Sequence, residues 1–271
     1  DHILNTPMYR VTFDQYGYIE SLWDKEEERE IRGEGASLSC LWMGEDVPMK
    51  WDNWDIDYDQ KHKMKLVKTL KETKVISSGP LMFVLRQTYD LSPTSELRRD
   101  MIFYADDRRI EFDNVVQWKE EQQLLKVGFD VNVLSQTVKN EIQFGHMDRP
   151  THENTSVDKA KFEVCNHKWS DLSENRYGVA ILNDCKYGIS VDGSDMRLTL
   201  LKSGCRPDPR GDAGTHKFTF SLLPHSGGFS TESVVRPAYE LNDPPLVMQG
   251  EVDDLFSEPI LKVEESNIIV E

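Results

Sequence analysis

The sequence predicts an all-β fold, in which antiparallel strands form a large β-sandwich with few or no long helices. Many short apolar runs are separated by turn residues, and several of them alternate apolar and polar side chains. No long stretch carries the apolar i, i+3, i+4, i+7 pattern of an amphipathic helix, which disfavours an alternating β/α architecture. Alternating strands instead suit antiparallel sheets stacked face to face. We expect residues 1–271 to form one such domain.

The N-terminal segment is expected to form a β-hairpin. Two aromatic-rich runs, residues 9–13 and 18–23, flank a turn that contains Gly17. The run at residues 25–30 follows, and we expect it to be a solvated loop because all six of its residues are charged.

The clearest strand is expected at residues 109–118, where Ile110, Phe112, Val116 and Trp118 alternate with polar side chains. Residues 127–133 repeat this alternation, so we expect both strands to have one solvent-facing side. Further strands are expected at residues 63–70, 81–89, 162–164, 178–182, 196–201 and 215–223. The irregular tail after Pro224 is expected to wrap around the domain and to supply a last strand from residues 260–263 and 268–270.

Charge and cysteine usage narrow the class of protein. The chain has 32 basic and 48 acidic residues and a formal net charge of −16, which disfavours nucleic acid and anionic membranes as partners. It has neither a long apolar run nor a secretory signal in residues 1–25, so it reads as soluble. Cys40, Cys165, Cys185 and Cys205 form no CxxC pair, which favours reduced thiols and a cytoplasmic location. The chain begins at Asp1 and not at Met, so we expect it to be either processed or a piece of a longer polypeptide.

An aromatic and acidic block, WDNWDID, begins at Trp51. Indole rings stack on the apolar faces of sugar rings, and carboxylates accept hydrogen bonds from sugar hydroxyls. Trp51, Asp52, Trp54 and Asp55 are therefore candidate sugar-binding residues. The alternative is that both tryptophans lie in the core and the aspartates form turns.

A second polar block lies between residues 144 and 203. Arg149, His152 and Asn154 either clamp a loop by charge-assisted hydrogen bonds or donate to sugar hydroxyls. His167 and Lys168 are further candidate sugar contacts, whereas the neighbouring Trp169 is expected to be buried.

Other histidines suggest a metal site or a packed side chain. Four side chains are of the types that bind metal ions: His146, Asp148, His152 and His167. Zinc needs ligands that the fold brings together and that neighbouring groups orient. We therefore favour hydrogen-bonding roles for these four residues and predict no metal site. His216 alternates with Phe218 and is expected to pack with a hydrogen bond to Asp212; alternatively, the loop at residues 206–215 reaches the rim of an active site.

Five separated sequence blocks follow one another along the chain: FGHMDRPTHENT, FEVCNHKWSDLSE, YGVAILNDCKYG, MRLTLLKS and GTHKFTFSLLPHSG. Together with WDNWDID and, more loosely, YRVTFDQYGYIESLWDK, they make the chain resemble the C-terminal β-domain of glycoside hydrolase family 38, the α-mannosidases. The resemblance departs at Asn53, where the family more often has Ala, and at Val157, where it often has Trp.

This resemblance implies a galactose-mutarotase-like supersandwich that belongs to a zinc-dependent, retaining α-mannosidase of the bacterial and cytosolic branch. It also implies that the zinc and the catalytic carboxylates lie in an N-terminal catalytic region that these residues do not include. We therefore predict no catalytic residue and no cofactor within the chain, with zinc in the parent enzyme. The expected partners are an α-mannoside, the parent's catalytic region and, as a further candidate, a second copy of the chain.

Two other functions remain open from the sequence. The chain could be an independent carbohydrate-binding module, or an aldose-epimerase-like enzyme that needs a histidine acid and a glutamate base, for which Glu163 and His167 are the nearest pair. A purely structural domain is the third alternative, and it predicts an exposed apolar patch where a neighbouring region docks.

Overall fold

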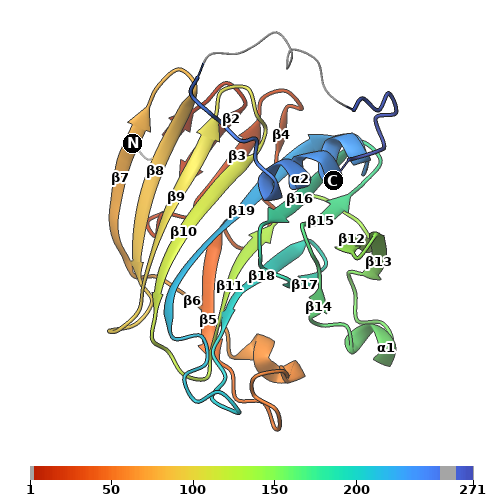
Figure 1. Ribbon diagram of the computed structural model, residues 1–271. Helices are drawn as coiled ribbons and strands as arrows, with labels where there is room; N and C mark the ends of the chain where they lie inside the picture. Colours follow the sequence, from red (N-terminus) through yellow and green to blue (C-terminus); the bar gives the residue numbers. More distant parts are fainter. Residues whose placement is uncertain (1–2, 251–260, 271) are drawn as a thin grey trace.

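The computed structural model describes residues 3–250 and 261–270, and antiparallel strands dominate it (Figure 1). The strands are β1 (Ile3–Asn5), β2 (Tyr9–Phe13), β3 (Ile19–Asp24), β4 (Arg29–Glu30), β5 (Cys40–Glu45), β6 (Lys65–Leu66), β7 (Leu70–Ser78), β8 (Met82–Asp90), β9 (Glu96–Tyr104), β10 (Ile110–Trp118), β11 (Gln123–Asp130), β12 (Thr137–Ile142), β13 (Gly145–Pro150), β14 (Val164–Cys165), β15 (Trp169–Ser173), β16 (Tyr177–Asn183), β17 (Gly188–Asp192), β18 (Asp195–Lys202) and β19 (Gly214–Ser226). The helical segments are η1 (Tyr58–His62), α1 (Ser156–Lys159), η2 (Thr231–Val235) and α2 (Arg236–Asn242).

The strands form three sheets. A nine-stranded sheet has the order β13-β12-β15-β16-β19-β10-β9-β8-β7, a six-stranded sheet has the order β14-β17-β18-β11-β5-β6, and β1 to β4 form a four-stranded sheet. Within the described ranges, α2 is the longest α-helix and has only 7 residues. The predicted antiparallel β-sandwich with few or no long helices is confirmed.

The predicted N-terminal hairpin is also confirmed, because β2 pairs antiparallel with β3. The turn is fixed by Asp14, whose Oδ1 accepts the backbone N–H groups of Tyr16 at 2.8 Å and Tyr18 at 3.0 Å. Gly17 has φ 78°, a left-handed conformation that glycine adopts without the steric cost of a side chain. The charged run that follows ends in β4, which pairs with β3, so only its first part is a loop.

The main core lies between the nine-stranded and six-stranded sheets. Phe112 of β10 stacks on Phe220 of β19 at a centroid distance of 5.0 Å, and both rings contact Phe129 of β11 edge-on at 5.8 and 6.2 Å. Offset and edge-on aromatic contacts of this kind add to the free energy of apolar burial. They join the two sheets at the middle of the sandwich.

The expectation of one solvent-facing side holds for β10 but is wrong for β11. Glu111, Asp113 and every second residue between Ile110 and Trp118 are less buried than their neighbours, whereas every residue of β11 from Leu124 to Asp130 is buried. The outer side of β11 is covered because the Trp42 ring lies over Gly128, where a Cβ would come within 2.9 Å of Trp42 Nε1.

The tail differs from its prediction. Ser230 caps η2, Pro237 stands in the first turn of α2, and these two segments pack on the outer face of β15, β16 and β19. There they bury a second apolar cluster, which contains Trp169, Ala180, Leu182, Leu223, Val234 and Ala238. Trp169 is 2% exposed, so its predicted burial is confirmed. Residues 261–270 contain no strand, so the predicted last strand is wrong there, while Ile260 lies outside the described residues.

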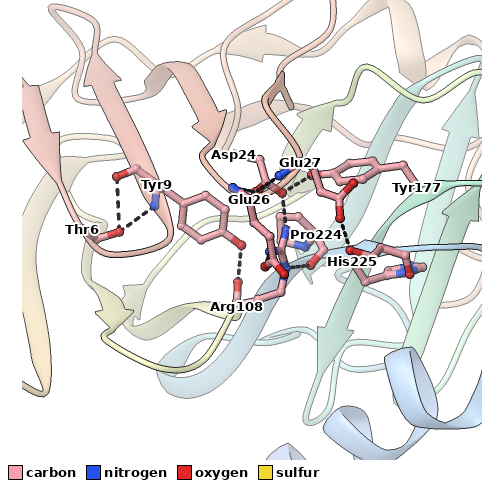
Figure 2. A network of polar contacts seen from close by, with 10 residues as sticks. Thr6, Tyr9, Asp24, Glu26, Glu27, Arg108, Tyr177, Pro224 and His225 are labelled. Carbon is pink, nitrogen blue, oxygen red and sulfur yellow. Dashed lines mark hydrogen bonds and ion pairs between the residues drawn. The ribbon is translucent and has the colours of Figure 1, made fainter.

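A buried polar network ties the four-stranded sheet to the nine-stranded sheet (Figure 2). Asp24, at the end of β3, is 0% exposed and forms an ion pair with Arg108. It also accepts the Tyr177 hydroxyl at 2.8 Å and the backbone N–H groups of Glu26 and Glu27 at 3.1 and 3.2 Å. Burial, together with the adjacent Asp24, raises the pKa of the Tyr177 phenol above its ordinary value, so this side chain remains a neutral donor.

Candidate functional site

The structure distributes the nine candidate sugar-binding residues around three hollows. Trp51, Asp52 and Trp54 line the first, which we call the tryptophan groove. His152 lines the second, which we call the lysine pocket because Lys126 lies in its wall. His167 and Lys168 line the third, which we call the β12 hollow. Asp55, Arg149 and Asn154 line none of the three.

The tryptophan groove is an open depression of about 740 Å³ between three connecting segments. They are the loop between β5 and η1, the turn between β10 and β11, and the loop between β18 and β19 (Figure 1). Its lining residues are Pro48, Met49, Lys50, Trp51, Asp52, Trp54, Glu121, Gln122, Cys205, Arg206 and Pro207. The loop after β18, predicted as a candidate rim, therefore does meet the tryptophan loop.

Asp52 fastens the tryptophan loop to the loop after β18. Its carboxylate accepts the backbone N–H groups of Cys205 at 2.9 Å and Arg206 at 3.0 Å. The Cys205 N–H in particular holds the pKa of Asp52 below its ordinary value. Gly204 permits this close approach, because a Cβ there would lie 2.7 Å from the carbonyl oxygen of Asp52. These two hydrogen bonds join the tryptophan loop to the loop after β18.

Both tryptophans face solvent. Trp51 is 66% and Trp54 is 69% exposed, and their rings meet edge-on at a centroid distance of 6.1 Å. The alternative that both are core residues is therefore wrong. Trp51 also has φ 59°, a left-handed conformation that is costly for a bulky side chain. Such strain persists only where surrounding contacts impose it, and it is common at functional sites.

Asp55 belongs to the turn that presents the tryptophan pair. Its backbone N–H and that of Trp54 both donate to the carbonyl oxygen of Trp51, at 2.9 and 2.8 Å. The Asp55 carboxylate accepts the N–H of Ile56 at 3.1 Å. In this conformation Asp55 stabilises the turn, and it does not line the groove.

The exposed indoles are part of a larger apolar surface. Met49 is 85% and Val47 is 41% exposed, and both precede Trp51 on the same loop. An exposed apolar surface is what the structural-domain alternative predicts, and a sugar-stacking surface has the same composition. Exposure alone does not separate the two, whereas the backbone strain at Trp51 favours a recognition role.

The lysine pocket has a volume of about 290 Å³ and lies on the outer side of the six-stranded sheet, beside η1 and the segment that contains α1. Its lining residues are Ile56, Gln60, Lys61, His62, Met64, Leu124, Lys126, Pro150, His152, Glu153, Asp158, Lys161, Phe162, Glu163, Ser190, Val191, Asp192, Asp195 and Arg197. Of these residues, only His152 was predicted from the sequence as a sugar-binding candidate.

One side of the lysine pocket is closed by contacts between η1 and the segment before α1. Glu153 accepts the Tyr58 hydroxyl at 2.6 Å and Lys61 Nζ at 2.8 Å. These two hydrogen bonds hold the pKa of Glu153 below its ordinary value, and the one from Lys61 has the larger effect. His152 Nδ1 lies 3.8 Å from the Asp158 carboxylate and 3.4 Å from the backbone nitrogen of Asn154, so part of its hydrogen-bonding capacity is used within its own loop.

Arg149 has the loop-clamping geometry that was one of its two predicted roles. Its Nη1 donates to the carbonyl oxygen of Cys165 at 2.6 Å, which joins β13 to β14. Asn154 is exposed and precedes Thr155, whose hydroxyl and Asp158 form the capping box of α1. Neither contact tests a role in sugar binding.

The β12 hollow brings His167 and Lys168 beside the helical tail. The His167 ring meets Tyr187 edge-on at 5.3 Å. Lys168 Nζ lies 4.3 Å from the centroid of Tyr239 in α2, and its backbone N–H donates to Glu141 at 2.6 Å. The two candidates therefore lie together, but in a different hollow from the tryptophans and from His152.

Glu163 and His167, the pair considered for epimerase chemistry, do not line a common hollow. Glu163 lines the lysine pocket and is ion-paired with Lys126, whereas His167 lines the β12 hollow. An acid and a base must face one sugar ring to interconvert anomers. This arrangement does not favour the epimerase alternative.

His216 is half-buried, and its Nε2 lies 2.6 Å from the Asp212 carbonyl oxygen, so the predicted contact with Asp212 is made through the backbone. The four cysteines are free thiols. Among residues 3–250 and 261–270, no helix is long and apolar enough to span a bilayer.

Comparison with known families assigns the chain. Residues 4–210 match the family described as "Glycosyl hydrolases family 38 C-terminal domain". The chain belongs to this family. The resemblance found in the sequence blocks is thereby confirmed.

Known relatives of this family 38 domain are α-mannosidases. "Alpha-mannosidase 2C1" of Homo sapiens is 39% identical over 246 residues, which cover 90% of this chain and 24% of that protein. "Alpha-mannosidase G" of Dictyostelium discoideum is 39% identical over 249 residues, covering 90% of this chain and 23% of that protein. The chain thus spans about a quarter of the length of these relatives.

A solved structure shows that the fold is shared. An alpha-mannosidase from Enterococcus faecalis V583 superimposes with a TM-score of 0.75 at 12% sequence identity, over 90% of this chain and 31% of that one. At this level of identity the superposition supports the sandwich architecture and not a shared site.

The described side chains do not fit a zinc ion. No three His, Cys, Asp or Glu side chains converge as a metal site requires in residues 3–250 and 261–270. His146 packs against Phe229 and Trp169 at centroid distances of 5.0 and 5.8 Å, and Asp148 is paired with Lys139. No catalytic step can therefore be assigned to a metal held by these residues.

Proposed function

We propose that this chain is the C-terminal, non-catalytic part of a zinc-dependent retaining α-mannosidase, and that the tryptophan groove contributes to its sugar-binding surface. Family membership and the α-mannosidase relatives support the first part of the proposal. Retaining glycosidases use a pair of carboxylates that flank the scissile bond. Those carboxylates and the zinc would belong to the N-terminal region of the parent.

The observation that carries the second part is the conformation of Trp51. Its side chain is 66% exposed, its backbone is strained, and Asp52 next to it is hydrogen-bonded to the loop after β18. A protein gains no stability from holding an exposed indole in a strained conformation. A pre-organised aromatic surface does assist the binding of sugar rings.

The experiment compares the full-length parent with a Trp51→Ala/Trp54→Ala variant. We expect kcat/KM for an aryl α-mannoside to fall at least about tenfold, which corresponds to about 1.4 kcal/mol of lost transition-state binding, while the urea unfolding midpoint stays unchanged. Leu81 is a matched exposed apolar residue, 75% exposed and outside all three hollows, and Leu81→Ala should leave kcat/KM unchanged. Equal activity of the tryptophan variant and wild type would contradict a role in substrate binding.

The division of labour is tested with the purified chain alone. It should not hydrolyse aryl α-mannosides, and chelators should not change its unfolding midpoint. Turnover by the chain alone that a chelator abolishes would overturn the proposal. A cytoplasmic location is part of the same proposal and is supported by the free thiols. Fractionation of the source cells would test it.

A further inference from the structure

We infer that the lysine pocket is a second ligand-binding site, separate from the tryptophan groove, and that it takes a neutral polyhydroxylated ring of monosaccharide size. The segment between β5 and β6 contributes to both hollows, Trp51 and Trp54 to the groove and Lys61 to the pocket. The inference does not depend on the activity of a parent enzyme. It concerns binding by this chain itself.

The pocket contains a buried ion pair that stability does not explain. Lys126 of β11 is 5% exposed, and its ammonium group pairs with Glu163 and donates to the Ser190 hydroxyl at 3.0 Å. Glu163 also accepts the Thr199 hydroxyl at 2.5 Å. Desolvation makes a buried ion pair no more stabilising than a packed apolar pair of similar size. Unlike the buried Asp24–Arg108 pair, this pair lines a cavity, so both charged groups can contact a ligand there.

The pair leaves donor and acceptor capacity next to each other. An ammonium group has three N–H donors, and Lys126 uses two of them within the described part of the chain. The Glu163 carboxylate has about four lone-pair sites and accepts two hydrogen bonds. A hydroxyl group both donates and accepts, so it can bridge such a pair, whereas a group that only donates or only accepts cannot.

The charge around the pocket selects against ions. Acidic and basic side chains both line it, with Asp192 and Asp195 placed near Arg197. A phosphate would meet these carboxylates, and a divalent cation would meet the lysines and the arginine. No three acidic, histidine or cysteine side chains converge within the described ranges, which also disfavours a cation. A neutral ligand avoids both repulsions.

The remaining wall is apolar and suits the C–H face of a ring. Phe162, Leu124 and Val191 line the pocket, and Phe162 is fixed edge-on against Tyr58 at a centroid distance of 5.5 Å and an angle of 90°. The volume of about 290 Å³ lies just below the range of about 300–1,000 Å³ that is usual for ligand pockets. That size favours one sugar ring over an oligosaccharide.

Calorimetry and ligand-observed NMR on the purified chain test this inference with the methyl glycosides of mannose, glucose and galactose. We expect at least one of them to bind saturably, and neither inorganic phosphate nor calcium to displace it. The Lys126→Met/Glu163→Met variant removes both charges and should lose at least about tenfold in affinity. Ser190→Ala keeps the ion pair, tests the site should the double variant not fold, and should lose about threefold.

Two controls locate the binding. Lys202→Met/Asp46→Leu removes a comparable buried ion pair outside the pocket, with side chains 16% and 1% exposed, and should bind as wild type does. In Trp51→Ala/Trp54→Ala any glycoside binding by the groove is lost, whereas the binding that depends on Lys126 and Glu163 should remain. If no glycoside binds, if phosphate or calcium competes, or if neither pocket variant weakens binding, the inference is overturned. Loss of binding only in the tryptophan variant would also overturn it, while supporting the proposed role of the groove.

Discussion

The ion pair between Asp24 and Arg108 should be among the polar contacts on which stability depends most. We expect Arg108→Met to lower the free energy of unfolding by about 3–5 kcal/mol, the usual cost of leaving a buried charge without its partner. Asp24 is 0% exposed, so water does not replace the guanidinium. Its remaining donors are the Tyr177 hydroxyl and two backbone N–H groups, which places the expected loss towards the lower end of that range.

The guanidinium of Arg108 has two arms, Nη2 toward Asp24 and Nη1 toward Glu26. The expected loss of unfolding free energy can be divided between them. The arm that reaches Glu26 is near the surface, since the Glu26 side chain is 65% exposed, and such pairs contribute about 0–1 kcal/mol. Glu26→Gln is therefore the matched control, with little expected effect. The arm that reaches Asp24, together with the hydrogen bond to the Pro224 carbonyl at 3.1 Å, accounts for the rest.

A second-site change separates charge from packing. In Arg108→Met/Asp24→Asn the buried group is neutral, and the asparagine amide can donate to the Tyr177 hydroxyl (Figure 2). We expect the double variant to recover at least about half of the lost stability, because the unpaired charge is gone. Urea unfolding followed by tryptophan fluorescence measures all three variants, provided that their m-values agree. A cost below about 1 kcal/mol for Arg108→Met, or a double variant less stable than the single one, would refute this reasoning.

Three further predictions depend on how deeply individual side chains are buried. Trp51→Ala/Trp54→Ala should change the free energy of unfolding by less than about 1 kcal/mol, whereas Trp118→Ala in the core should cost about 3–5 kcal/mol, and urea unfolding compares them. Burial raises the pKa of Glu111, so its contribution to stability is present below the unfolded-state pKa and is lost as the pH rises. In the same assay Glu111→Gln should therefore become more stable relative to wild type as the pH rises above the ordinary glutamate pKa of about 4.3, and a difference in stability that stays constant with pH would contradict this. Burial also raises the pKa of the Cys40 thiol to about 12, so mass spectrometry after brief alkylation should find Cys165 labelled before Cys40.

The sequence predicted β10 well because its pattern reports a local fact. Ile110 and Phe112 face the core while Glu111 and Asp113 are less buried, and alternation records this directly. The solvent-facing side expected for β11 was wrong because Trp42 and Glu163, far away in sequence, cover that strand. Such covering depends on tertiary packing, which a period of two cannot reveal.

The tail and the sites show the same limit. Residues 231–242 form η2 and α2 although they are too short for a helical pattern to stand out. The tryptophan loop was predicted as a candidate site from composition, but only the structure shows that Trp51 is exposed and strained. Lys126 and Glu163 are separated by 37 positions and carry no motif, so no sequence signal could have joined them.

The position of β19 matters for anyone who wishes to express this region as a fragment. The match to the family 38 C-terminal domain ends at residue 210, yet β19 begins at Gly214 and separates two groups of four strands in the nine-stranded sheet. A fragment that ends at residue 210 would leave β16 and β10 as unpaired edge strands. It would also lack Phe220, which packs in the middle of the sandwich. Unpaired edge strands of that length promote aggregation. A fragment that extends through Asn242, the end of α2, keeps every helix and strand of the described residues.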